Sequence, residues 1–121
     1  MRTARICLMT ILVTMLLPAM AMCALAIGSP SVQPVQFSPT KGESVKLVYT
    51  LSAPAKVRIC IYSPDDVLVR TVINWEARTA DKHADVWDGK DDRGKILPYE
   101  AYYFTVEARD SKGTLGTYDP A

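Results

Sequence analysis

The fold is decided by the stretch VKLVYTL at residues 45–51 and by the segment VRICI that follows it at residues 57–61. In both stretches every second side chain, counted from the first valine, is a large apolar one. Such alternation is typical of a β-strand that buries one face. A turn at Ser52–Ala55, which contains Pro54, separates the two segments. We therefore predict two consecutive strands that pair as a hairpin.

Further short alternating segments follow along the chain. Strands are predicted at residues 67–73, 84–87, 102–108 and 114–118, with proline, glycine or aspartate between them. Residues 76–83 are polar and poorly periodic, so they are predicted to form a loop. Helical periodicity is not sustained after residue 26, which favours an all-β antiparallel sandwich. The predicted core consists of Leu47, Tyr49, Val57, Ile59, Ile61, Trp87, Phe104 and Val106.

The N-terminus has the pattern of a secretory signal peptide. Arg2 and Arg5 precede the apolar run at residues 6–17, Pro18 ends that run, and several alanines follow. The run is shorter than the ~20 residues that span a bilayer. We therefore expect a cleaved signal and no membrane span in the mature chain.

Two A-x-A cleavage sites compete, one at Ala19-Met20-Ala21 and one at Ala24-Leu25-Ala26. The sequence favours the second site, because the ordered chain is expected to start only after Gly28-Ser29-Pro30. Cleavage there assigns residues 1–26 to the signal peptide. The mature chain would then begin at Ile27.

The three cysteines bear on processing and on disulfides. Acylation of Cys23 would make a lipoprotein, but Met22 stands where that motif normally has a small residue. Because Cys7 and Cys23 lie within the signal, the mature chain keeps only Cys60. Its isoleucine neighbours predict a shielded strand residue, and a bridge between two chains is the alternative.

Cleavage would leave about 95 of the 121 residues, enough for one domain with its own core. Residues 27–40 are rich in proline and are expected to form a linker or an edge strand, whereas residues 41–121 are expected to form the sandwich domain. Loss of the two arginines lowers the formal net charge from +1 to about −1. This balance argues against a nucleic-acid partner.

The segment VWDGKDDRGKILP at residues 86–98, which leads into Tyr102, resembles the immunoglobulin-like domain of the flagellar hook-capping protein FlgD. Glu100 departs from that family, whose members usually carry a glycine shortly before this tyrosine. Other segments agree in order at residues 37–39, 48–51, 69–71 and 106–108.

The resemblance implies an immunoglobulin-like sandwich and a scaffold role outside the cytoplasm, with no catalytic residue to carry over. Domains of this family also recur in secreted bacterial enzymes and surface proteins as packing or attachment modules. We therefore expect a secreted module that binds a protein partner in the periplasm or at the cell surface. Pairing through an open edge strand is one route to such binding.

Asp88, Asp91 and Asp92 lie beside Gly89 and Gly94, a grouping that could suggest a calcium loop. The spacing departs from the EF-hand, because the glycine comes too early and no glutamate follows at the twelfth position. A structural turn is predicted instead, and no metal or cofactor is expected. The predicted structural motif comprises Trp87, Asp88, Gly89, Asp91, Gly94 and Tyr102.

His83 is the only histidine, with Asp81 and Asp85 two residues to either side. A hydrolytic triad also needs a nucleophile, and the chain has no serine in a G-x-S-x-G setting. We therefore predict that the protein is not an enzyme. A small hydrolase that uses His83 is the weakest alternative.

The aromatic side chains are the features that could recognise a ligand. Trp87 and Tyr102 are predicted to belong to the core, which leaves Trp75 and Tyr99 as exposed candidates for binding. Such rings can anchor a protein interface or stack on a sugar. A glycan is therefore the alternative partner, and simple packing within loops is the third interpretation.

Overall fold

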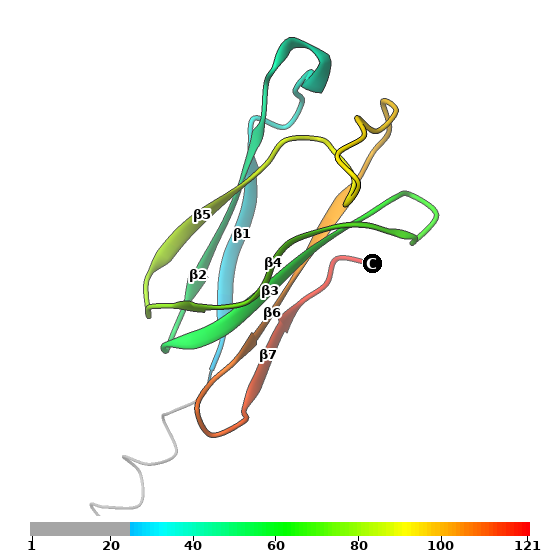
Figure 1. Cartoon of the computed structure of the whole chain (residues 1–121). Helices are drawn as coiled ribbons and strands as arrows, with labels where there is room; N and C mark the ends of the chain where they lie inside the picture. The colour runs from blue at the N-terminus through cyan, green and yellow to red at the C-terminus, as the bar shows by residue number, and fades with distance from the viewer. Residues whose placement is uncertain (1–24) are drawn as a thin grey trace, which may run out of the picture.

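The computed structural model describes residues 25–121, so Cys23 and most of the predicted signal segment lie outside the described residues. These residues form a sandwich of two antiparallel sheets with strand orders β1-β2-β5 and β4-β3-β6-β7 (Figure 1). The predicted all-β sandwich is therefore confirmed. Its elements are β1 (Ile27–Gln33), the short 3-10 helix η1 (Pro39–Lys41), β2 (Val45–Leu51), β3 (Ala55–Tyr62), β4 (Leu68–Arg78), β5 (Lys82–Trp87), β6 (Tyr103–Arg109) and β7 (Leu115–Tyr118).

The core lies between the two sheets and follows the period-two pattern of the strands. All eight side chains that the sequence places in the core are buried, and Tyr49, Val57 and Ile59 are inaccessible to solvent. Alternation predicts the core well, because successive side chains of a strand point to opposite faces of its sheet.

The predicted hairpin between β2 and β3 is wrong. β2 pairs with β1 and β5, whereas β3 pairs with β4 and β6, so the turn after Leu51 carries the chain from one sheet to the other. Two strands that face each other across a core show the same alternation as two strands of one sheet. The pattern therefore cannot distinguish a hairpin from a crossing between sheets.

The predicted loop at residues 76–83 is also largely wrong, because β4 continues to Arg78 and β5 begins at Lys82. The ladder between β3 and β4 shifts register just before this segment, and Trp75 has a φ of +57°. An irregularity of this kind breaks the alternation of the side chains although the strand continues. The alternating pattern in the sequence therefore ends before the strand itself does.

Residues 27–33 form β1, an edge strand that pairs with β2. The strand includes Gly28-Ser29-Pro30, although the sequence suggested that the ordered chain starts only after them. Leu25, two residues before β1, is also described and is only 8% exposed. Within residues 25–121, no helix is long and apolar enough to cross a membrane.

Cys60 lies in β3, an interior strand, and is only 3% exposed, as predicted for a shielded strand residue. Its sulfur lies 4.0 Å from the hydroxyl oxygen of Thr71 on β4. Burial raises the pKa of the Cys60 thiol above its ordinary value.

Substitution of Trp87 tests the core. Trp87 is 5% exposed, so we expect Trp87→Ala to lower the free energy of unfolding by about 3–5 kcal/mol, the usual cost of removing a large buried aromatic side chain. The measurement is the denaturant midpoint. Val86→Ala is the matched control, because the neighbouring Val86 is 54% exposed. Equal midpoints for the two variants would contradict the buried role of Trp87.

Candidate functional site

The segment between β5 and β6, residues 88–102, carries the chain from one sheet to the other, and Trp87 anchors its start. The Trp87 indole N–H donates to the carbonyl oxygen of Lys90 at 3.0 Å. The same ring makes edge contacts with Phe37 and Tyr102, at centroid distances of 5.8 and 5.5 Å. One buried side chain thus holds both ends of the segment and the residues that lead into η1.

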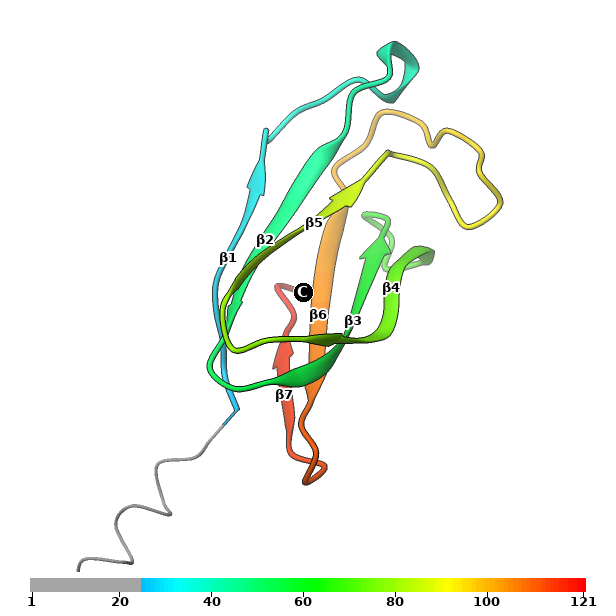
Figure 2. The same cartoon turned by 60° about the vertical axis from the view of Figure 1, so that its left-hand side comes forward.

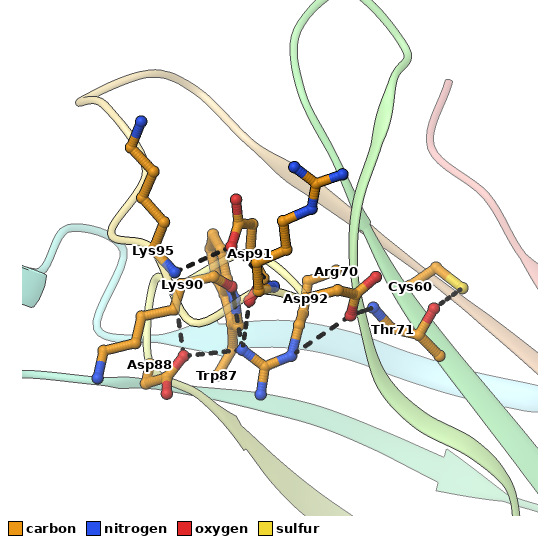
Figure 3. Close-up of polar contacts among 10 residues, drawn as sticks. Cys60, Arg70, Thr71, Trp87, Asp88, Lys90, Asp91, Asp92 and Lys95 are labelled. Carbon is orange, nitrogen blue, oxygen red and sulfur yellow. Dashed lines mark hydrogen bonds and ion pairs between the residues drawn. The ribbon is translucent and has the colours of Figure 1, made fainter.

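Arg70 of β4 fastens the segment from the other sheet (Figure 3). Its Nη1 atom donates to the Asp88 carboxylate at 3.1 Å, to the Lys90 carbonyl at 3.0 Å and to the Asp91 carbonyl at 3.4 Å. This role of Arg70 was not predicted from the sequence. The available signal was the position of Arg70 in one of the segments that match the family pattern.

Each of the three aspartates accepts hydrogen bonds from the protein itself. Asp91 accepts the backbone N–H groups of Arg93 and Lys95, both at 2.9 Å, and these bonds lower the pKa of the Asp91 carboxyl. Asp88 accepts the N–H of Lys90, and Asp92 accepts that of Thr71. Within residues 25–121, the structure contains no cluster of three or more His, Cys, Asp or Glu side chains arranged to hold a metal.

Gly89 allows its backbone to lie close to Pro39 of η1. Its φ is +79°, and a Cβ atom built on it would lie 2.3 Å from Cγ of Pro39. Gly94 has a similar φ of +82°, but a Cβ atom there would meet open space. The two glycines of the motif therefore have different roles: Gly94 supplies a backbone conformation, whereas Gly89 also supplies room for the chain near η1.

The end of the segment does not require a glycine before Tyr102. Among the described residues, a positive φ at a residue other than glycine occurs at Ser29, Asp66 and Trp75, so Glu100 has an ordinary backbone conformation. The Tyr102 hydroxyl donates to the carbonyl oxygen of Pro98 at 2.7 Å. This bond closes the turn although the chain departs from the family pattern at Glu100.

Residues 88–102 cross between the two sheets and form the crossing segment. This crossing segment and the residues after β1 together form an apolar groove with a volume of about 630 Å³. Both segments lie at the same end of the sandwich (Figure 2). Val35 and Tyr99 line the groove and are each 83% exposed, and Ile96 beside them is 39% exposed. Phe37 and Leu97 form part of its floor, packed against the core.

Trp75, the other predicted binding residue, lies elsewhere. The guanidinium carbons of Arg109 and Arg58 lie 4.2 and 5.3 Å from the centre of its ring. Trp75 does not line the groove that contains Tyr99. The structure therefore does not bring the two candidates into one site, and arginine side chains already cover Trp75.

His83 and Asp85 lie on β5 and make internal contacts. Nε2 of His83 lies 2.8 Å from the carbonyl oxygen of Thr79. The Asp85 carboxylate accepts the Tyr49 hydroxyl at 2.8 Å and pairs with Arg78 at 2.9 Å, which joins the two sheets. Burial and the bond to Asp85 raise the pKa of Tyr49 far above its ordinary value. The Asp85 carboxylate therefore has a structural role, as the acidic partner in an ion pair between β5 and β4.

Comparison with known proteins gives a family match and a structural match. Residues 35–112 match the model of the FlgD Ig-like domain. The solved structure of FlgD from P. aeruginosa has a similar fold, with a TM-score of 0.56 and 22% sequence identity. The match covers 78% of this chain and 62% of that chain, so the matched region is less than two thirds of that structure. A search of curated proteins finds no match.

The two motif glycines provide a paired test. We expect Gly94→Ala to cost about 1 kcal/mol of stability, because alanine tolerates a positive φ poorly. Gly89→Ala should cost about 1–3 kcal/mol more, because its Cβ would also overlap Pro39. Urea unfolding of both variants measures the difference. Equal losses would show that the packing against Pro39 contributes nothing.

Calcium should not affect stability. The carboxylates of Asp88, Asp91 and Asp92 already accept backbone N–H groups, so we expect thermal melts with calcium and with chelator to coincide. A cation bound only by the folded state would raise stability by RT ln(1 + [L]/Kd). A melting temperature that rises with calcium concentration would contradict the turn assignment.

Proposed function

The chain belongs to the FlgD Ig-like domain family, and from this membership we propose that it is an exported, non-enzymatic scaffold or attachment module. It acts through contacts with a protein partner in the periplasm or at the cell surface. Support for export comes from the basic, apolar and small-residue order of the N-terminus.

The groove that contains Tyr99 is the observation that carries the proposal. It presents exposed apolar side chains from two segments that are distant in the sequence but fixed to the same sandwich end. Exposed apolar surface of this kind marks interaction sites, and a tyrosine adds a large rigid contact with a polar hydroxyl. Residues 35–112, the part that matches the family, include Val35, Ile96 and Tyr99.

The hydrogen bonds that hold one wall of the groove in place suit a binding role. Trp87 and Arg70 hold the crossing segment by hydrogen bonds to its backbone, so the groove wall is fixed before a partner arrives. A preformed surface loses less conformational entropy on binding than a mobile one.

The two alternative functions fit the described contacts less well. A hydrolase would use His83 and an aspartate, whereas the structure engages Asp85 with Tyr49 and Arg78. A glycan module would use the rings of Trp75 and Tyr99 together, but Trp75 does not line the groove that contains Tyr99, and the guanidinium carbon of Arg109 lies 4.2 Å from the centre of the Trp75 ring. Both assignments are therefore weaker than a protein contact at the groove.

A crosslinking experiment tests the proposal. We expect a photo-crosslinking side chain at position 99 of the exported protein to trap one protein partner, and the same group at position 115 to trap none. Leu115 is the matched control, because it is an exposed apolar residue on β7, 53% accessible, that does not line the groove.

Affinity for the trapped protein should then fall about tenfold or more in Tyr99→Ala, as expected for an aromatic anchor, and remain unchanged in Leu115→Ala. Equal affinities would contradict the groove assignment. Loss of glycan binding in Trp75→Ala, or of a hydrolytic activity in His83→Ala, would replace the proposed function.

A further inference from the structure

Leu25 precedes β1 and belongs to the hydrophobic core. Its side chain is 8% exposed and packs in the cluster that fills the sandwich. It covers Gly116 of β7, where a Cβ atom would lie only 3.4 Å from Cγ of Leu25. Leu25 therefore contributes apolar burial at the point where β1 passes beside β7.

Ala26 is also tied to the domain, through its backbone. Its N–H donates to the Ser52 hydroxyl oxygen at 2.7 Å, and its carbonyl accepts the N–H of Ser52 at 3.1 Å. The next residue, Ile27, pairs with Leu51. The ladder between β1 and β2 thus continues one residue beyond the strand on the N-terminal side.

Cleavage after Ala26 would remove both of these features. The mature chain would lose a core side chain and the two hydrogen bonds to Ser52. Cleavage after Ala21 would keep them and add three residues before Leu25. The site Ala19-Met20-Ala21 also has small residues at the two positions that signal cleavage requires, and it follows directly after Pro18 at the end of the apolar run.

We infer that the signal is cleaved after Ala21, so that the mature protein begins at Met22 and retains Leu25 and Ala26 as part of its sandwich. This inference rests on the export that the proposed function requires. It differs from the site that the sequence alone favours, it assigns Leu25 and Ala26 to the working domain, and it keeps Cys23 as well as Cys60 in the mature chain.

The first test is the N-terminus of the exported full-length gene product, measured by intact-mass and peptide spectrometry. A chain that starts at Met22 supports the inference. A chain that starts at Ile27, or one acylated at Cys23, overturns it while export itself stands. A chain that retains residues 1–21 and stays in the cytoplasm overturns both the inference and the proposed export.

Two substitutions sharpen this test. Ala21→Asp places a large charged group directly before the proposed cleavage and should abolish the Met22 start. Ala26→Asp is the matched control, because the Ala26 side chain is exposed in the domain, and it should leave the Met22 start unchanged. The opposite pattern would assign cleavage to the second site.

Leu25→Ala gives an independent readout, the melting temperature of the exported protein. If Leu25 is retained, the variant loses a buried side chain and should melt about 5 °C or more below the wild type. If cleavage occurs after Ala26, the two mature proteins have identical sequences. Coincident melts would then overturn the inference.

Discussion

The burial of the Trp87 indole is the contact on which the rest of the structure depends. Trp87 ends β5, and its ring contacts both Phe37 and Tyr102, so one residue joins three separate segments. Its N–H donates to a backbone carbonyl, so the polar nitrogen is buried without becoming an unpaired donor. Arg70 reaches the same carbonyl from the opposite sheet. The loop between the sheets is thereby fixed, and so is the groove beside it.

The sandwich and its core could be predicted from the sequence because each strand reveals which side chains it buries. Strand partners could not, because pairing joins residues that are distant along the chain. The turn after Leu51 leads to the opposite sheet although its sequence is typical of a hairpin. Trp75 shows a second limit: its positive φ and the nearby register shift break the alternation, so the sequence pattern of β4 ends before Arg78.

In the candidate site, too, local features could be predicted from the sequence and tertiary ones could not. The grouping of Asp91 with Gly94 predicts a turn, since an aspartate accepts local backbone N–H groups and a glycine adopts a positive φ without strain. The position of Tyr99 between Pro98 and Glu100 is typical of an exposed loop residue. The groove itself could not be predicted, because Val35 and Tyr99 come from segments that only the folded chain brings together. The role of Arg70 depends on the same tertiary arrangement.

The buried thiol of Cys60 has a consequence for the folding of a chain that is exported as proposed. Thiolate is the form that reacts with oxidants, and burial raises the pKa of this thiol, so the folded domain carries an inert sulfur. An unfolded chain exposes the same sulfur at its ordinary pKa. In an oxidising compartment, folding therefore competes in time with oxidation. Disulfides through Cys60 would form from chains that fold too slowly, so the fraction of chains with an oxidised Cys60 would rise with the lifetime of the unfolded state.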